Sequence, residues 1–284
     1  MTGITAYVNG RFLPLGEAAV GIEDRGYQFG DGIYEVVRVY GGTPFKMREH
    51  LDRLRRSARA IELDLPDLDR LTEDALELLK RNGLRECSLY IQVTRGVCPR
   101  KHTVPRGIAP TVVMTAREVA GFPAEYRSRG VKLITVPDDR WARCYIKTTN
   151  LLPNVLARSK AERAGAYEAV FVRDGFVMEC SSSNLFIVES GALVTPPLTN
   201  YILAGVTRAT VIQLAEELGI EVREEAVSLE RLYRSDEVFV TGTVTEIVPA
   251  VDIDGTTVGT GKPGPVFSLL YRGYTGLTAG AGDA

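Results

Sequence analysis

Residues 33–40 form a strand-like run of β-branched and aromatic residues whose alternate positions divide into two faces. Ile33, Val37 and Val39 share one face of this segment with Glu35. Because successive side chains of a strand point to opposite faces, the alternation predicts a β-strand with one mainly apolar face.

The segment before this strand predicts a β-hairpin followed by a loop. Residues 4–8 and 11–14 are strand-like, and they are joined by Asn9-Gly10, a pair that favours a type I′ turn. Residues 24–32 hold three glycines and are interpreted as a mobile loop that leads into the strand at Ile33.

Apolar positions that recur every three or four residues predict an amphipathic helix over residues 46–63. A second helix is expected at about residues 68–81, between Pro66-Asp67 and Asn82-Gly83. The arginines of the first helix are interpreted individually as a solvated basic face. They are Arg53, Arg55, Arg56 and Arg59.

A long loop is expected over residues 95–107, between strands at 88–94 and 111–116. Arg100 and His102 lie within it, and the loop has few apolar residues that could belong to a core. It is either a basic surface loop or a site that captures a substrate carboxylate, since loops of this length are more often functional than idle.

The second half of the chain predicts short strands joined by tight turns, followed by a helix. The elements, together with the helix after residue 150, indicate a mixed α+β fold with antiparallel meanders. The expected strands are 131–136, 168–173, 176–179, 185–189, 192–195, 221–225 and 237–240; the expected helices are 150–165, 205–219 and 229–233; and the last ten residues are expected to fray.

Residues 121–130 are polar and contain Pro and Gly, which favours a domain boundary. We therefore expect an N-terminal α/β domain at residues 1–120, a linker at 121–130 and a C-terminal α/β domain at 131–284.

Lys147 follows Tyr145 and Ile146, which suit a strand, and precedes Asn150, which can cap a helix. The C-terminal domain would therefore carry this lysine at a strand-to-helix junction. On these residues alone it is either an exposed lysine at a strand end or a functional amine.

Composition narrows the classes of partner. The 34 Lys and Arg balance 36 Asp and Glu to a net charge of −2, which gives no general attraction to nucleic acid or anionic membrane. The four cysteines have no metal-ligand spacing and are expected to be reduced, so no metal is expected. The N-terminus does not resemble a signal peptide and no apolar stretch reaches 18 residues, which favours the cytoplasm.

Two short segments could bind an anion. Gly205-Val206-Thr207 begins a helix, and Thr241-Gly242-Thr243 follows a strand. Taken alone, each is more commonly an ordinary cap or turn. Glu179, before the serines 181–183, is either a solvated acid or a group that holds a ring nitrogen protonated. Together with Lys147 they suit pyridoxal phosphate, whose chemistry needs an imine-forming lysine, an acid at the pyridine nitrogen and phosphate donors.

Several motifs resemble, in order and spacing, the D-amino-acid aminotransferases, a branch of the fold-type IV pyridoxal phosphate enzymes. The resemblance covers about residues 5–255, and the Arg100 and His102 loop favours this branch over its branched-chain and lyase relatives. The motifs are DRGYQFGDGIYEVV at 24–37, EHLDRL at 49–54, QVTRG at 92–96, PRKH at 99–102, RW at 140–141, IK at 146–147, NLL at 150–152, ECSSSN at 179–184 and GVTR at 205–208.

The resemblance implies a role for each matching residue and an active site between two domains. Lys147 would form the imine and move the proton between substrate and cofactor, and Glu179 would face the pyridine nitrogen. Tyr34, Arg100 and His102 would bind the substrate carboxylate, the last two reaching in from the neighbouring subunit of a homodimer. The remaining cofactor-binding residues would be Arg53, Val206, Thr207 and Thr243 at the phosphate, Leu203 at the ring, and Ser182 near the substrate.

Two positions depart from the family pattern. Cys180 stands where glycine is common, and Gly242 stands where a residue with a hydroxyl group is common. The expected function is cytoplasmic, ping-pong amino transfer between D-amino acids such as D-alanine and 2-oxo acids such as 2-oxoglutarate and pyruvate. The alternatives are a branched-chain L-aminotransferase, an aminodeoxychorismate lyase, and a noncatalytic pyridoxal phosphate carrier or interaction protein.

Overall fold

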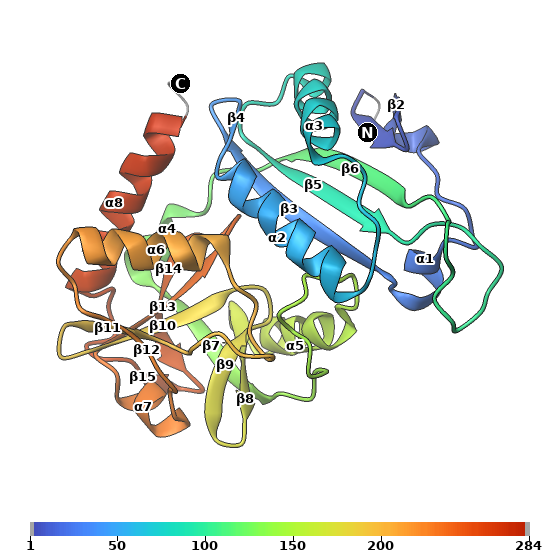
Figure 1. Cartoon of the computed structure of the whole chain (residues 1–284). Helices are drawn as coiled ribbons and strands as arrows, with labels where there is room; N and C mark the ends of the chain where they lie inside the picture. Colours follow the sequence, from blue (N-terminus) through green and yellow to red (C-terminus); the bar gives the residue numbers. More distant parts are fainter. Residues whose placement is uncertain (1–2, 282–284) are drawn as a thin grey trace. The chain divides into compact units, whose positions relative to one another are not determined.

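The computed structural model describes residues 3–281, which divide into two compact units. The first unit holds the described residues up to Ala120, the segment Ile146–Asn150 and residues 279–281; the second holds Gly121–Tyr145 and Leu151–Thr278. Each unit contains a β-sheet with helices packed on it, as Figure 1 shows by element. The predicted α+β class is confirmed.

A six-stranded antiparallel sheet forms the centre of the first unit, in the order β2-β1-β6-β5-β3-β4. Asn9 and Gly10 both have positive φ, 48° and 83°, so the predicted hairpin turn is confirmed. The strands are β1 (Thr5–Val8), β2 (Arg11–Pro14), β3 (Gly32–Tyr40), β4 (Thr43–Pro44), β5 (Cys87–Thr94) and β6 (Thr111–Glu118).

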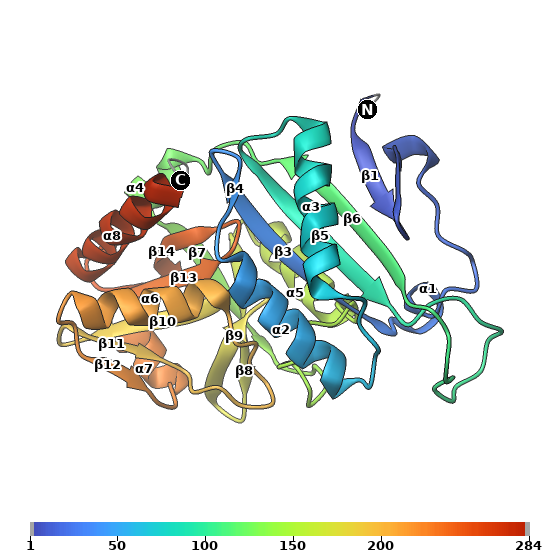
Figure 2. The ribbon, with the colours of Figure 1, turned by 45° about the horizontal axis from the view of Figure 1, so that its top comes forward.

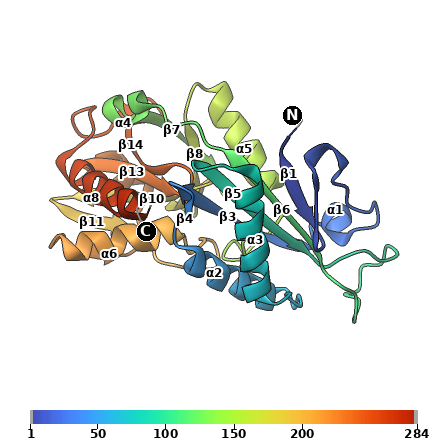
Figure 3. The same ribbon diagram turned by 90° about the horizontal axis from the view of Figure 1, so that it is seen from above.

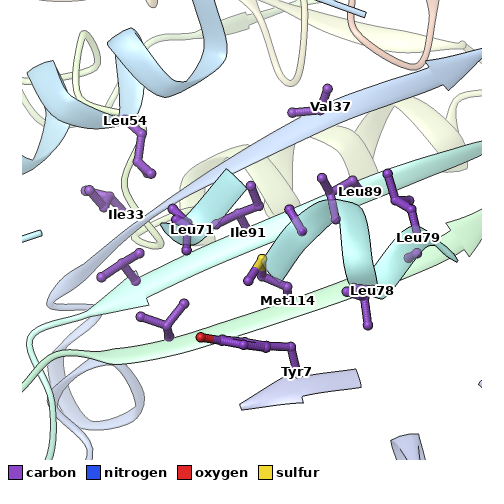
Figure 4. Packing of buried hydrophobic residues seen from close by; sticks show 14 of the residues in the cluster. Tyr7, Ile33, Val37, Leu54, Leu71, Leu78, Leu79, Leu89, Ile91 and Met114 are labelled. Carbon is purple, nitrogen blue, oxygen red and sulfur yellow. The ribbon is translucent and has the colours of Figure 1, made fainter. Parts of the chain in front are cut away.

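Two helices, α2 (Met47–Ala60) and α3 (Leu68–Asn82), pack their apolar faces on this sheet (Figure 2). Leu54 of α2 and Leu78 of α3 are fully buried with Ile33, Leu89 and other strand residues (Figure 4). Asp67 caps the start of α3 by accepting a hydrogen bond from the Arg70 amide, and Gly83 ends the helix with φ 61°.

The glycine-rich segment before β3 is a short helix, α1 (Arg25–Phe29), so the prediction of a mobile loop there is wrong. The Asp24 carboxylate caps the helix by accepting a hydrogen bond from the Gly26 amide at 2.8 Å. Gly30 ends the helix with φ 66°, and a Cβ at this position would lie 2.3 Å from Asn150 Oδ1. Glycine therefore serves here to end α1 and to admit the Asn150 side chain.

The segment Ile146–Asn150 belongs to the first unit, in contrast to its expected place in a domain at 131–284. Thr148 forms an isolated bridge with Ile33, and the Thr149 amide donates to Gly32 O at 3.0 Å. Tyr145 and Ile146 form no strand, and helix α5 (Leu152–Arg163) is not capped by the Asn150 side chain, which donates instead to Gly30 O. The domain boundaries at residues 120 and 131 stay a prediction.

The second unit contains a nine-stranded sheet in the order β12-β11-β10-β13-β14-β7-β8-β9, with β15 paired to β14. The sheet is mixed, because β7 runs parallel to both β8 and β14, and β11 runs parallel to β12. Its strands are β7 (Val131–Pro137), β8 (Glu168–Arg173), β9 (Phe176–Cys180), β10 (Asn184–Glu189), β11 (Ala192–Thr195), β12 (Val222–Glu224), β13 (Glu237–Gly242), β14 (Glu246–Ile253) and β15 (Thr256–Thr257).

Helices α6 (Val206–Glu217) and α8 (Pro265–Ala281) lie side by side in the second unit (Figure 3). A Cβ at Gly273 of α8 would lie 2.9 Å from the Leu214 methyl groups of α6, so glycine permits this close approach. Phe267 of α8 packs its ring near Phe239 of the sheet. The short helices are η1 (Leu15–Glu17) in the first unit, and α4 (Ala124–Arg129) and α7 (Leu229–Arg234) in the second.

One sequence prediction for this half of the chain needs correction, and one strand was missed. Residues 121–130, whose role as a linker stays a prediction, contain α4, and Arg127 of this helix forms an ion pair with Glu246. Strand β14 was not predicted. The described part of the C-terminal ten residues belongs to α8 rather than fraying, and residues 282–284 lie outside the described part of the chain.

Candidate active site

Lys147 is held through its backbone on both sides. The Tyr34 amide donates to Lys147 O at 2.9 Å, and the Lys147 amide donates to Ser57 Oγ at 3.1 Å. The side chain is half-buried, with Nζ 4.4 Å from the centroid of the Tyr34 ring. The interpretation as an exposed lysine at a strand end is therefore wrong, because the residue is half-buried and does not end a strand.

A buried cluster of Glu35, His50 and Arg53 lies between β3 and α2. Arg53 Nε donates to Glu35 Oε1 at 2.7 Å, Arg53 Nη2 donates to Glu35 Oε2 at 2.8 Å, and His50 Nδ1 lies 2.8 Å from Oε2. Arg53 is therefore part of a buried ion pair, whereas Arg55, Arg56 and Arg59 are exposed as expected.

The pKa shifts of Glu35 and His50 indicate which of these two groups is charged at pH 7. Burial alone would raise the pKa of Glu35, but the charge and hydrogen bonds of Arg53 outweigh it and lower this pKa to about 2. Burial lowers the pKa of His50, and the bond to Glu35 only partly offsets this effect. His50 is therefore neutral at pH 7 and donates through Nδ1 to the ionised Glu35, which leaves Nε2 as an acceptor.

The residues expected to bind the substrate carboxylate lie on two elements of the first unit. Tyr34 lies on β3 and stacks on Tyr90 with ring centroids 5.5 Å apart. Arg100 and His102 are exposed on the loop between β5 and β6, and both lie beside Phe29 of α1. The shared role of these residues at one carboxylate stays a prediction.

Glu179 ends strand β9 in the second unit and is buried in a network of donors. Arg140 Nη1 donates to Glu179 Oε1 at 2.6 Å, and the Leu203 amide donates to Oε2 at 2.9 Å. Arg140 in turn pairs with the buried Asp138 at 2.8 Å, and its guanidinium keeps the pKa of Asp138 below the ordinary value although burial acts in the opposite direction. Arg140 and its partners thus rule out the interpretation of Glu179 as a solvated acid.

The serines 181–183 form a corner organised by one carboxylate, Glu168 at the start of β8. Glu168 is fully buried, and its Oε1 accepts from Ser181 Oγ at 3.0 Å and from the amide and hydroxyl of Ser182. Its Oε2 accepts from Ser183 Oγ at 2.7 Å. Ser182, a predicted cofactor-binding residue, is therefore fixed from its side chain and its backbone, while the residue itself is exposed.

The start of α6 has the features of an anion site. Val206 and Thr207 are buried, and no side chain caps the helix, so the first amides have no capping acceptor. The hydroxyl oxygen of Thr241, at the end of β13, is buried and has no hydrogen-bond partner among the described residues. An unpaired buried donor and uncapped amides both suit a bound phosphate.

Asn184 joins these parts of the second unit. Its Nδ2 lies 3.3 Å from Glu179 Oε2 and 3.0 Å from Leu203 O, and it pairs with Thr241 in the sheet. A Cβ at Gly205 would lie 2.0 Å from Asn184 Oδ1, so glycine is required at the start of α6. The structure therefore brings together Glu179, the serine corner, Leu203 and both predicted anion-binding turns.

The two departures from the family pattern occupy different environments. Cys180 is buried in the core of the second unit, and burial raises the pKa of its thiol well above the ordinary value. At Gly242 an added Cβ would meet its neighbours at 3.7 Å, which is ordinary contact. A Cβ atom would therefore fit at Gly242, whereas Cys180 takes part in packing.

The predicted site residues thus fall into two groups. Lys147, Tyr34, Arg53, Arg100 and His102 belong to the first unit. The second unit contains Glu179, Ser182, Leu203, Val206, Thr207 and Thr243.

Glu168, Glu35 and the pair Asp138 and Arg140 have supporting positions that sequence reasoning missed. A signal existed for Glu35, because a carboxylate on the apolar face of β3 needs a buried partner.

A family model described as amino-transferase class IV matches residues 32–253 of the chain. The chain belongs to this family. The match spans β3, which carries Tyr34, and continues through the described site residues to β14.

Two curated relatives show which branch of the family the chain resembles. The chain is 46% identical over 259 residues to a D-alanine aminotransferase of Bacillus licheniformis, covering 91% of each chain. It is 43% identical to a D-alanine aminotransferase of Staphylococcus haemolyticus, covering 94% of this chain and 95% of the relative. The resemblance to the D-amino-acid aminotransferases is confirmed.

Solved structures of class IV relatives share the fold. A branched-chain amino acid aminotransferase of Escherichia coli has a TM-score of 0.91 at 31% identity, covering 98% of this chain and 96% of that chain. A branched-chain aminotransferase of Thermoproteus uzoniensis with norvaline has a TM-score of 0.88 at 31% identity, covering 98% and 95%. The fold is that of the fold-type IV aminotransferases, and identity is lower to these branched-chain enzymes than to the D-alanine aminotransferases.

The family implies pyridoxal phosphate as the cofactor, and the uncapped start of α6 and the unpaired Thr241 hydroxyl fit its phosphate. None of the helices within residues 3–281 is both long and apolar enough to span a membrane.

Proposed function

We propose that this chain transfers amino groups between D-amino acids, such as D-alanine, and 2-oxo acids, such as 2-oxoglutarate and pyruvate, with pyridoxal phosphate as cofactor. The observation that carries the proposal is the 46% identity to a D-alanine aminotransferase across 91% of both chains. The reaction would follow a ping-pong route, in which one amino acid leaves as its oxo acid before the second oxo acid binds.

The second unit would hold most of the cofactor. Bound pyridoxal phosphate supplies a carbonyl that reacts with amines and a ring that accepts electrons. Glu179, hydrogen-bonded to Arg140, would accept a hydrogen bond from the ring nitrogen and favour its protonated form. The phosphate would bind the amides of Val206 and Thr207, with Thr243 and Arg53; Leu203 would support the ring, and Ser182 would lie near the substrate.

Lys147 Nζ would attach the cofactor and then move a proton from the substrate Cα. The backbone bonds to Tyr34 and Ser57 fix the base of its side chain, so the amine has a restricted range of positions. Tyr34, Arg100 and His102 would bind the substrate carboxylate. With the carboxylate held on one side, the Cα hydrogen of only one enantiomer faces Lys147, and this geometry would select the D-enantiomer.

The active protein would be a homodimer in which Arg100 and His102 of one subunit complete the site of the other. Helix α5 exposes an apolar stripe of Leu152, Val155 and Leu156, with exposed fractions of 67%, 55% and 61%. Exposed apolar side chains at spacings of three and four residues on one helix favour a protein partner, and a second copy of the chain would cover them.

We place the protein in the cytoplasm, because its four cysteines are unpaired in the structure, as expected in a reducing compartment.

A half-reaction panel tests the substrate assignment. The holoenzyme is mixed with single D- or L-amino acids, and conversion of the cofactor to its amine form is followed by absorbance. D-alanine is expected to convert the cofactor, and 2-oxoglutarate or pyruvate to restore it. Conversion by L-leucine without conversion by D-alanine would assign the branched-chain alternative instead, and no conversion by any amino acid would favour a noncatalytic carrier.

A further inference from the structure

Phe29, the last residue of α1, is a half-buried aromatic side chain that the described core of the first unit does not contain. In Figure 1 the loop between β5 and β6 runs beside α1. An aromatic ring outside the core and beside a cationic loop needs an explanation other than packing of the fold.

The base of the loop is fastened to the start of α1. The Arg25 amide donates to Gly96 O at 2.9 Å, and the Cys98 amide donates to Glu23 O at 3.3 Å. The buried side chain of Arg25 continues this connection, since its Nη1 donates to Lys101 O at 2.6 Å. Lys101 lies between Arg100 and His102, so Arg25 fixes the backbone at the centre of the predicted carboxylate-binding pair.

The ring of Phe29 contacts the side chains on both sides of that point. The Arg100 guanidinium lies 4.7 Å from the Phe29 centroid, within cation–π range. The His102 ring centroid lies 5.6 Å from it at an interplanar angle of 54°. The Arg25 guanidinium also lies 4.7 Å from the same ring. One aromatic side chain therefore orients both exposed residues of the pair.

The charges around Phe29 leave Arg100 available to an anion. Arg25 is compensated by Asp31 at 2.7 Å, which Arg95 shares at 2.8 Å. Within residues 3–281 no carboxylate lies in ion-pair distance of Arg100. An acidic side chain paired with Arg100 would compete with the substrate carboxylate for the guanidinium. The Phe29 ring can hold the guanidinium in place without such competition.

We propose that Phe29, seated by Arg25, is a positioning residue for substrate recognition: it holds Arg100 and His102 in the orientation that binds the carboxylate of the amino acid or oxo acid. The inference rests on the proposed function of that pair and adds a residue that touches neither substrate nor cofactor. Because Phe29 and the loop belong to one chain, α1 of each subunit would set the carboxylate affinity of the site that its loop completes.

The test compares three holoenzyme variants with the wild type. Phe29→Leu removes the ring, Phe29→Tyr keeps it, and Tyr27→Leu removes the exposed aromatic residue two positions earlier on α1 as a matched control. Two quantities are measured: the KM and kcat for D-alanine, and the dissociation constant of propionate, a carboxylate that cannot react, from the change in cofactor absorbance. A primary amine without a carboxylate serves as the comparison substrate in the half-reaction.

Phe29→Leu is expected to raise both the KM for D-alanine and the propionate dissociation constant about tenfold, with a smaller change in kcat. Phe29→Tyr and Tyr27→Leu should stay near the wild type, and the amine half-reaction should be unaffected by all three. Unchanged propionate binding in Phe29→Leu, or equal losses for the amine and D-alanine, would overturn the inference. If the wild type fails to convert D-alanine, the proposed function is wrong. The propionate dissociation constants of the wild type and Phe29→Leu would still show whether Phe29 affects carboxylate binding.

Discussion

Arg53 of α2 and Glu35 of β3 form a buried ion pair through two hydrogen bonds, Nε to Oε1 at 2.7 Å and Nη2 to Oε2 at 2.8 Å. Glu35 is fully buried and Arg53 is 4% exposed, so neither charge is solvated by bulk water. The pair also orients His50, and α2 contributes Ser57, which binds the Lys147 amide. Helix α2 thus connects the ion pair to the predicted catalytic lysine.

Glu35→Gln should lower the free energy of unfolding by about 3 kcal/mol, because it leaves the Arg53 charge buried without its carboxylate. Arg56→Gln, on the exposed face of the same helix, should change it by less than about 0.5 kcal/mol. Urea unfolding followed by circular dichroism, at a fixed cofactor concentration, measures both. Equal stabilities of the two variants would contradict the ion pair.

Stability should fall as the pH drops below about 6.5, with His50 as the first cause. The pKa of His50 is lower in the folded protein than its ordinary 6.5, so the unfolded chain takes up this proton first and becomes favoured. The slope is at most about 1.4 kcal/mol per pH unit for one group. Glu35, with a pKa lowered to about 2 from 4.5, adds a second loss that begins near pH 4.5 and ends near pH 2.

The two histidines of the chain allow a matched test of this pH dependence. His50→Gln should remove most of the change in unfolding free energy between pH 7 and pH 5, since glutamine does not titrate and can still donate to Glu35. His102→Gln, on the exposed loop, should keep the wild-type slope. If His50→Gln kept the wild-type slope and His102→Gln removed it, His50 would have the same pKa in the folded and the unfolded chain.

Thr241→Val should weaken cofactor binding without weakening the fold. The Thr241 hydroxyl is buried and has no partner among the described residues, so an apolar side chain of the same shape removes an unsatisfied group. If this hydroxyl donates a hydrogen bond to the phosphate, the dissociation constant of pyridoxal phosphate should rise about tenfold. A rise of this size corresponds to the loss of one hydrogen bond to a charged group. Thr257→Val, at an exposed strand position, is the control. An unchanged cofactor affinity in Thr241→Val would exclude a role of the Thr241 hydroxyl in phosphate binding.

Hybrid dimers test whether the loop acts on the neighbouring subunit. Lys147→Ala and Arg100→Ala chains are co-expressed with different tags, and the mixed dimer is purified. One of its two sites would combine an intact Lys147 with an intact loop from the other chain, so roughly half of the wild-type D-alanine activity is expected. A loop that served its own chain would leave the hybrid without an intact site, and the activity would be about half that of the Arg100→Ala dimer, because only one of the two sites would keep Lys147.

Local patterns were sufficient for much of the fold. The strands at 168–173 and 192–195 have the bounds that short strand-like runs between tight turns predict, and α3 has the expected cap and terminal glycine. These features depend on residues close together in sequence. Helix α8 was missed because several glycines lower its intrinsic helix propensity, and its packing depends on Leu214, 59 positions before Gly273.

The amino-acid sequence by itself determined the chemical groups of the predicted site, because a lysine, a carboxylate and two possible anion-binding turns can be identified from residue type and order. Only the tertiary structure decided which charged groups are buried and which partners they have. Arg53 changed from one of four surface arginines to half of an ion pair, and Glu168 was found to organise serines 13 to 15 positions later. The reason is physical: a buried charge is stable only with partners brought from distant parts of the chain, and sequence spacing does not specify them.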